Sequence, residues 1–331
     1  MATPLIPQEV YLLERFSTLD YFRPIRDNYE AAVRHAEQCL EAFVNDLPPD
    51  YRSRHLSQQP DIVWGERVLP NMRETLNALI RGYIRISHGE LKGLGSAGRV
   101  ESDRRGIVDH DVSWMDEPQV TAVVPGGSHL FWELFGATLS PASMVTNTID
   151  RYWDAGDLTD RYLEGSFGPL NPPKQWPRYR LNRTVLVATG DPIPRNGIFL
   201  PDIDQSCASL LVVGERAPKA NHLIRIDTRI DENGIKRGET PISEKCPTTW
   251  TLIERVPGET VPSEEGLGPT GSTPERVPAG KPVTQSGYWF TPAKQGSRRY
   301  FKQGDVFPEI EGSPWGDTFW QWAPDQSDPK L

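Results

Sequence analysis

A segment that begins at residue 190 recurs 90 positions later, at residue 280. The two copies, at about 190–215 and 280–305, align without a gap. Their identical positions are Gly190 and Gly280, Pro192 and Pro282, Gly197 and Gly287, Gln205 and Gln295, and Gly214 and Gly304. Glycine permits positive φ angles and proline fixes φ, so shared glycines and prolines mark the turns of a common backbone. The chain therefore repeats a small module of turns and short strands.

The apolar positions between these turns also correspond. The matching pairs are Ile193 with Val283, Phe199 with Trp289, Leu210 with Tyr300, and Leu211 with Phe301. No His, Cys, Asp or Glu is identical between the copies. A duplicated active site is expected to keep its reactive groups. The repeat is therefore interpreted as a scaffold for a binding surface that is built twice.

The first half of the chain has the periodicity of helices. Apolar residues recur at helical spacing over 21–45 and again over 71–90. A third helix is predicted to begin at Ser140 and Pro141, because serine is a good N-cap and proline suits the first helical position. The intervening residues 99–128 are irregular and charged, with a short strand predicted at 119–124.

The second half has the pattern of β-structure. Short β-branched runs at 184–189, 209–213, 223–230 and 248–254 are bounded by Gly, Pro, Asn or Asp. The sequence Asp-Glu-Asn-Gly at 231–234 predicts a hairpin turn, and residues 257–282 have the composition of an exposed linker. We therefore expect an α+β protein with an α-helical domain at 1–165. A β-rich domain at 166–331 contains the duplicated module.

Charge is distributed unevenly between the halves. Residues 1–165 carry 25 acidic and 16 basic side chains, whereas residues 166–331 carry 20 of each. An acidic half argues against nucleic acid as a ligand, because proteins that bind phosphate backbones present a basic face. It favours a basic protein partner, for which complementary charge speeds association. The alternative is an acidic surface that only maintains solubility.

Composition also bears on location and cofactors. Cys39, Cys207 and Cys246 are too few and too scattered for a disulfide framework or a zinc cluster, and no cofactor is predicted. A Cys207–Cys246 bridge remains open. No apolar run approaches the length of a membrane span, and the first residues do not resemble a signal peptide. We expect a cytoplasmic protein with reduced thiols.

The residues Gly93, Gly95 and Gly98 match the GxGxxG pattern of dinucleotide-binding loops. That function requires a loop that leaves a strand and opens a helix, so that the phosphates meet free backbone N–H groups. Here the pattern follows a predicted helix. It is interpreted as a helix C-cap with a flexible exit, and a nucleotide site is rejected.

Two other groups of residues are candidates for catalytic sites. Asp109, His110 and Asp111 are the best candidate for a metal or an acid–base site, but alternation along a strand would point His110 away from the two carboxylates. An acidic surface loop is the favoured interpretation. Cys207 has His222 as its nearest histidine in sequence, and a small buried thiol is the favoured interpretation there.

Aromatic residues are concentrated near the C-terminus. They comprise Tyr288, Trp289, Phe290, Tyr300, Phe301, Trp315, Phe319, Trp320 and Trp322. Aromatic and arginine residues often anchor interfaces, and these rings lie close to Arg298 and Arg299. The alternative is the core of a small β-module, in which Phe319 and Gln321 face one way and Trp320 and Trp322 the other. We expect most of the rings to be buried and one or two to be exposed.

Several stretches of the second half resemble a known family. They are NPPKQWPRY at 171–179, GIFLPD at 197–202, GYWFTPA at 287–293, SRRYFKQG at 297–304 and TFWQW at 318–322. Together they resemble bacterial polymorphic-toxin immunity proteins, of the kind encoded beside type VI secretion effectors and Rhs-type toxins. The resemblance covers roughly residues 170–322, and the sequence departs from it at 313–316. It implies a cytoplasmic, non-catalytic protein that binds and neutralises a cognate toxin.

The expected function is therefore inhibition of a toxin by direct binding, in which an acidic surface covers a basic active site. The predicted toxin-contacting residues are Glu101, Asp103, Asp109, Asp111, Asp116 and Glu117. The partner is expected to be a protein with a basic surface, with no nucleic acid or membrane involved. The alternatives are a metal-dependent hydrolase that uses Asp109, His110 and Asp111, and an adaptor or chaperone that loads an effector.

Overall fold

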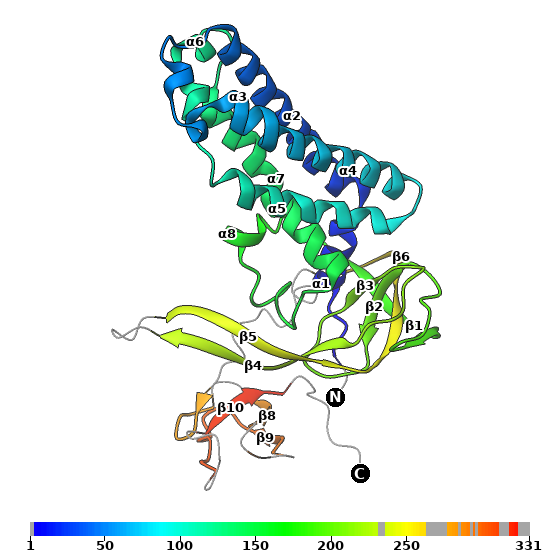
Figure 1. Ribbon diagram of the computed structural model, residues 1–331. Helices are drawn as coiled ribbons and strands as arrows, with labels where there is room; N and C mark the ends of the chain where they lie inside the picture. The colour runs from blue at the N-terminus through cyan, green and yellow to red at the C-terminus, as the bar shows by residue number, and fades with distance from the viewer. Residues whose placement is uncertain are drawn as a thin grey trace. The chain divides into compact units, whose positions relative to one another are not determined.

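The computed structural model describes residues 3–230, 236–262, 277–283, 286–291, 294, 297–310 and 318–323. They belong to two compact units, unit 1 (Met1–Gly266) and unit 2 (Leu267–Leu331). Helices come first and β-sheets follow, which confirms the α+β class (Figure 1). Residue 165 lies where helices give way to strands. It does not separate the compact units, because the first copy of the module belongs to unit 1.

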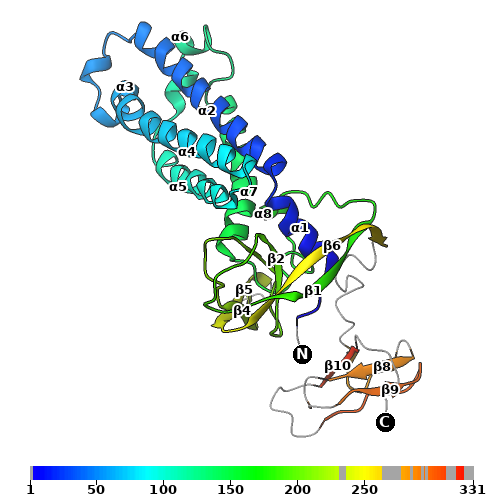
Figure 2. The same ribbon diagram turned by 90° about the vertical axis from the view of Figure 1, so that its right-hand side faces the viewer.

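Three long helices run side by side in unit 1 (Figures 1 and 2). They are α2 (Leu19–Asn45), α4 (Leu69–Ser87) and α7 (Gly127–Asp150), and the first two confirm the predicted helices. The shorter helices are α1 (Pro7–Phe16), α3 (Pro60–Val63), α5 (Gly98–Ile107), α6 (Pro118–Thr121) and α8 (Glu164–Phe167). Short segments of tighter or wider helix are η1 (Tyr51–Ser53), η2 (Leu56–Gln58), η3 (Trp64–Val68), η4 (Leu91–Ala97) and η5 (Ser113–Asp116). None of the described helices is both long enough and apolar enough to cross a membrane.

The start of α7 differs from the prediction. The helix begins at Gly127, so Ser140 is not its N-cap and Pro141 lies inside it. The Asp116 carboxylate accepts hydrogen bonds from the Ser128 N–H at 2.8 Å and from the Ser128 hydroxyl. This cap satisfies a free N–H of the first turn, but it comes from outside the helix. No local sequence pattern reveals it.

The strand predicted at 119–124 is wrong. Pro118 opens the one-turn helix α6, and the residues after it continue in a turn. Val120 is fully buried, whereas Val123 is 71% exposed. The buried Val120 and the half-buried Val124 pack against the core at this end of the bundle, and they account for the apolar character of the segment.

The GxGxxG segment does not form a flexible segment after the preceding helix. It forms η4, which packs against α4 so closely that a Cβ atom on Gly93 would lie 2.5 Å from the Gly82 carbonyl oxygen. A Cβ atom on Gly95, by contrast, would meet open space. Close helix packing therefore explains at least one glycine of the pattern.

The strands of unit 1 form a four-stranded sheet and a hairpin. The sheet has the order β1 (Trp176–Ala188), β6 (Thr249–Val261), β2 (Gly197–Pro201), β3 (Ser209–Leu211). The hairpin pairs β4 (Ala220–Ile230) with β5 (Lys236–Cys246), and the predicted turn at 231–234 lies outside the described residues. The predicted linker begins later than expected, because β6 continues to Val261. Residues 263–276 lie outside the described residues.

Unit 2 contains a second four-stranded sheet with the order β7 (Val277–Pro278), β10 (Phe319–Trp322), β8 (Gly287–Phe290), β9 (Arg299–Phe301). The repeat found in the sequence is reproduced in its register. Gly197 pairs with Leu211 in unit 1, and Gly287 pairs with Phe301 in unit 2, which is the same pairing shifted by 90 residues. The two copies form separate sheets rather than one.

The structure adds a fourth strand to the repeated module. Trp250 on β6 pairs with Val187, and Trp320 on β10 pairs with Val277. Both indole N–H groups donate a hydrogen bond of 2.8 Å to a proline carbonyl oxygen, that of Pro218 or that of Pro308. These strands are related by a shift of 70 residues, because the β4–β5 hairpin lengthens the first copy.

Each module buries the same face of its sheet in a small core. In unit 1 this core includes Phe199, Leu211, Trp250 and Leu252, and in unit 2 the matching positions are Trp289, Phe301, Trp320 and Trp322. The expectation for the aromatic tail is confirmed in part. Two rings are exposed, Tyr300 at 53% and Phe319 at 41%, but fewer than expected are buried: among the described rings Trp289, Phe301 and Trp320 are buried and the remaining ones are half-buried. Trp315 lies outside the described residues. The opposite face of the first sheet joins the main core of the helices.

Candidate functional site

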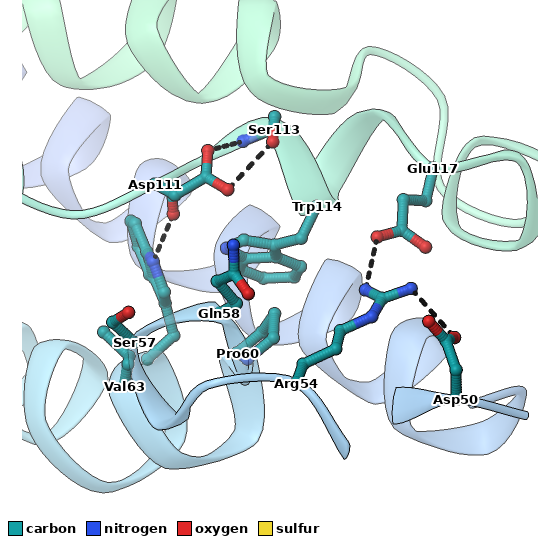
Figure 3. Close-up of a pocket in the computed structure, with 11 residues that line it drawn as sticks. Asp50, Arg54, Ser57, Gln58, Pro60, Val63, Asp111, Ser113, Trp114 and Glu117 are labelled. Carbon is teal, nitrogen blue, oxygen red and sulfur yellow. Dashed lines mark hydrogen bonds and ion pairs between the residues drawn. The ribbon is translucent and has the colours of Figure 1, made fainter. Parts of the chain in front are cut away.

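A hollow of about 370 Å³ lies at the end of the helical bundle that carries α3 and α6, away from the sheet (Figures 1 and 3). We call it the tip pocket. Its lining consists of Asp50, Arg54, Ser57, Gln58, Pro60, Val63, Trp64, Asp111, Ser113, Trp114 and Glu117. Two segments distant in sequence form it, the turns between α2 and η3 and the turns between α5 and α6. The pocket is therefore a product of tertiary packing.

Two tryptophans form the buried part of the lining. Trp64 is 1% exposed and Trp114 is 4% exposed, and their rings meet edge to face with centroids 5.6 Å apart. The Trp64 indole N–H donates to the backbone carbonyl of Asp111 at 2.9 Å, which fixes the acidic segment against η3. The indole N–H of Trp114 is buried and has no acceptor among the described residues.

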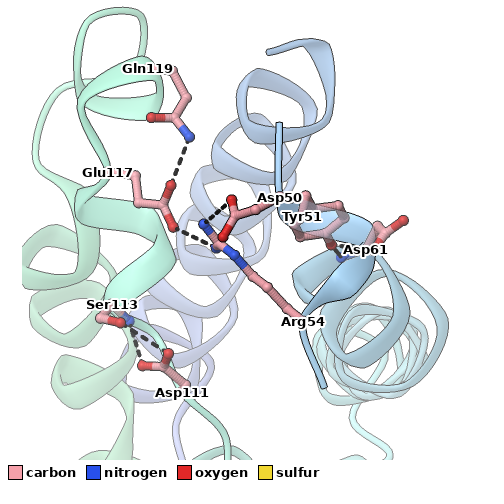
Figure 4. Close-up of polar contacts among 8 residues, drawn as sticks. All are labelled: Asp50, Tyr51, Arg54, Asp61, Asp111, Ser113, Glu117 and Gln119. Atoms are coloured by element: carbon pink, nitrogen blue, oxygen red, sulfur yellow. Dashed lines mark hydrogen bonds and ion pairs between the residues drawn. The ribbon is translucent and has the colours of Figure 1, made fainter. Parts of the chain in front are cut away.

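Arg54 lies between two carboxylates at the rim (Figure 4). Its guanidinium nitrogens are 3.4 Å from an oxygen of Asp50 and 3.5 Å from an oxygen of Glu117. Tight pairs between arginine and carboxylate groups measure about 2.7–2.9 Å, so both contacts are loose. Glu117 also accepts a hydrogen bond of 2.8 Å from the Gln119 amide. The rim thus carries an arginine that neither carboxylate holds firmly.

The Asp111 side chain closes a local turn. Its carboxylate accepts hydrogen bonds of 2.9 Å from both the N–H and the hydroxyl of Ser113 (Figure 4). This geometry stabilises the turn before η5 and leaves Asp111 exposed. The negative charge of Asp111 therefore faces solvent at the mouth of the pocket, without an arginine or lysine partner among the described residues.

A second polar group stands beside the pocket. The Tyr51 hydroxyl donates to the Asp61 carboxylate, which also pairs with Arg52 at 2.7 Å. Burial, followed by the hydrogen bond to Asp61, raises the pKa of Tyr51 to about 12. Although burial raises the pKa of Asp61, the hydrogen bonds from Tyr51 and Arg52 outweigh it and keep that pKa below its ordinary value. The Tyr51 hydroxyl therefore stays neutral and Asp61 stays ionised, and the hydrogen bond between them connects η1 to α3.

Of the six predicted contact residues, two line the tip pocket, Asp111 and Glu117. Asp109 is exposed in the same segment, and Asp116 is exposed although Ser128 engages both of its carboxylate oxygens. Glu101 does not line the pocket, because it lies on α5 and pairs with Arg104 at 3.3 Å. The structure therefore brings part of the predicted set together.

The assignment of Asp103 to a contact loop is wrong. Asp103 lies inside α5 and is 4% exposed. Its carboxylate accepts hydrogen bonds from the Tyr29 hydroxyl and from the Asn71 amide, the latter at 2.9 Å. Burial raises its pKa. Asp103 is a structural residue that links three helices.

The catalytic alternatives gain no geometric support. Asp109, His110 and Asp111 follow α5 as a turn rather than a strand, with the His110 N–H donating to the Ile107 carbonyl at 3.0 Å. No three His, Cys, Asp or Glu side chains converge as metal ligands would among the residues that the structure describes.

The cysteines are unpaired, so the structure contains no Cys207–Cys246 bridge. Cys207 is buried, as expected, and burial followed by the nearby Glu9 carboxylate raises its pKa. His222 contacts the Asp204 carbonyl oxygen at 2.8 Å through its Nδ1 atom. A raised pKa keeps the Cys207 thiol protonated, which suits a structural residue rather than a nucleophile.

Sequence reasoning missed Asp50, Arg54, Trp64 and Trp114. The one available signal was a tryptophan in a strongly polar stretch, since residues 108–126 contain four carboxylates, no Lys or Arg, and Trp114.

Comparisons with protein-family models, curated proteins and solved structures gave no match for this chain. An aromatic floor beneath carboxylates is an arrangement that favours a cationic side chain.

Proposed function

We propose that this chain is an immunity protein that binds a toxin domain through the tip pocket and blocks the toxin's active site. The observation that supports the proposal is the composition of the pocket. Asp111 and Glu117 present negative charge at the rim, above the buried rings of Trp64 and Trp114. A lysine or arginine of a basic toxin surface fits such a hollow, because it gains both charge pairing and contact with aromatic rings.

Arg54 has a defined part in this mechanism. Its contacts with Asp50 and Glu117 are long, so a cation from the partner competes with it for the same carboxylates. Interface energy is concentrated in a few central residues that fill pockets. We therefore place the centre of the interface at the tip pocket. The surrounding acidic segment of residues 108–126 contributes attraction over a longer range.

The electrostatic contribution to association is modest at each site. Two unit charges about 7 Å apart in water interact by about 0.6 kcal/mol, and reversing one of them changes this energy by about twice that amount. Physiological salt reduces the effect to roughly half. Changing Asp111 or Glu117 to lysine should therefore slow association about twofold each, and the double variant about fivefold.

The test is co-expression of this chain with the product of the adjacent gene, scored for survival and for co-purification. Survival together with a stable complex is the expected result. A complex that forms without protection would instead identify an effector-loading adaptor. Failure of both survival and co-purification would refute the proposal.

The location of the interface is tested with Asp111→Lys/Glu117→Lys in that complex, by measuring association rates at two salt concentrations. The matched control for each single variant, Asp111→Lys or Glu117→Lys, is Asp20→Lys, which makes the same change in charge at an exposed position at the opposite end of α2. A helix of this length places the control roughly 40 Å from the tip, several screening lengths away. Equal association rates for Asp20→Lys and for each single variant at the tip would show that the toxin binds elsewhere.

A further inference from the structure

The two copies of the module differ in what covers one face of the sheet. In unit 1 this face is formed by Ile198, Leu200 and Leu210, which are 5%, 5% and 2% exposed. All three belong to the main core of the helices, and α1 and α7 contact β2 and β3. The first sheet therefore lies under a helical layer.

The equivalent positions in unit 2, shifted by 90 residues, are Tyr288, Phe290 and Tyr300. Tyr288 and Tyr300 pair across β8 and β9, with ring centroids 5.4 Å apart. Tyr300 is 53% exposed, and Phe319 on β10 is 41% exposed. We call these four residues the aromatic face. Each of the three aliphatic side chains Ile198, Leu200 and Leu210, which pack under the helices in the first copy, is an aromatic ring in the second.

The aromatic face lies opposite the core of unit 2. That core uses the other side of the sheet, with Trp289, Phe301, Phe307 and Trp320 all buried. The part of unit 2 that the structure describes contains no helix. A sheet with two apolar faces is normally packed on both, and contiguous exposed aromatic residues mark interaction sites.

Positive charge lies beside these rings. Arg298 and Lys302 flank β9 (Arg299–Phe301), the strand that carries Tyr300. The Arg298 guanidinium stacks on the Tyr288 ring at 4.1 Å. Unit 2 as a whole is neutral, because residues 267–331 carry seven basic and seven acidic side chains, so the positive charge of Arg298 and Lys302 is local to this part of the sheet. A partner for this surface should therefore be apolar and acidic.

We propose that the aromatic face of unit 2 docks an acidic amphipathic helix of another protein. The apolar stripe of that helix covers Tyr300 and Phe319, as α1 and α7 cover the matching face in the first copy. Its flanking Asp and Glu side chains face Arg298 and Lys302. This inference is independent of the tip pocket and of the proposed immunity function, because it rests on the comparison of the two copies.

The probe is a fluorescein-labelled 18-residue helical peptide with leucine on one face and glutamate on the other. A second peptide keeps the leucines and replaces glutamate with lysine. Binding of each to the full chain is measured by fluorescence anisotropy. The glutamate peptide should bind at least tenfold more tightly than the lysine peptide, because only its charges complement Lys302. Equal binding of both peptides, or none, would overturn the proposal.

Variants locate the binding. Tyr300→Glu should weaken binding of the glutamate peptide at least tenfold, and Lys302→Glu should weaken it about threefold while strengthening binding of the lysine peptide. The control is Tyr152→Glu, since Tyr152 is 63% exposed on unit 1. Equal loss in the control and in Tyr300→Glu would overturn the proposal. Two other results would also overturn the proposal, because each assigns the aromatic face to another occupant. One is binding of a labelled oligothymidine that Tyr300→Glu abolishes, and the other is self-association in sedimentation that Tyr300→Glu abolishes.

Discussion

Replacing Gly93 with alanine is expected to destabilise unit 1, although the residue lies in a segment that resembles a ligand-binding loop. The new Cβ atom would lie 2.5 Å from the Gly82 carbonyl oxygen and 3.1 Å from side-chain carbons of both Arg85 and Ile86. The carbonyl belongs to the backbone of α4 and cannot rotate aside. The crossing of η4 and α4 must therefore widen by about 0.5 Å or more.

The magnitude follows from two opposing effects. Overpacking costs about 1–3 kcal/mol, and a backbone obstacle places Gly93→Ala near the upper value. Alanine also lowers the conformational entropy of the unfolded chain, which stabilises the folded state by about 0.4–1 kcal/mol. The net loss should be about 2 kcal/mol. Gly95→Ala meets open space and keeps only the second effect, so the two variants should differ by about 3 kcal/mol.

The assay is calorimetry of the full chain, supported by urea unfolding. For a unit of this size, about 2 kcal/mol corresponds to a fall in Tm of about 4–8 °C, whereas Gly95→Ala should raise Tm by about 1–3 °C. The urea m-value should stay constant if only the native packing changes. Similar Tm values for the two variants would refute the packing argument. Stabilisation of the wild-type chain by NADH that both variants abolish would restore the dinucleotide interpretation.

Three further predictions concern buried polar groups. Burial raises the pKa of Glu9 to about 7, so above pH 4.5 the folded state retains a proton that the unfolded state has lost. The free energy of unfolding should therefore fall by up to about 3 kcal/mol between pH 4.5 and 7. Glu9→Gln should abolish this pH dependence in urea titrations. Trp250→Phe and Trp320→Phe should each destabilise their own unit by about 1–3 kcal/mol in calorimetry, because each leaves a proline carbonyl without its donor. Asp103→Lys should cost about 3–5 kcal/mol in urea unfolding, whereas Asp109→Lys should change stability by less than about 0.5 kcal/mol.

The repeat was predictable because it depends on local chemistry. Glycine and proline set the turns, and alternating apolar residues set the faces, so the sequence alignment at 90 residues matches the strand register. Strands were predicted at 248–254 and 319–322, but their equivalence was missed for a topological reason. Trp250 and Trp320 are related by 70 residues, and a search at one fixed spacing cannot find both relationships.

The candidate site was harder to predict than the fold. Asp103 and Asp109 are six positions apart in one acidic segment, yet one is buried in the bundle and the other is exposed. Burial depends on which helix packs against which, and net charge contains no such information. The remaining lining of the tip pocket, including Arg54, comes from a segment that tertiary packing alone brings close.

The β4–β5 hairpin shows where this scaffold tolerates a change in length. Ala220 pairs with Cys246, so the hairpin leaves and rejoins the module at adjacent points. Because the second copy forms the same four-stranded register without it, the connection between the third and fourth strands accepts an arm of about 20 residues. An engineered loop or affinity tag placed there should leave the sheet intact. The two copies within this single chain already differ by that length at this connection.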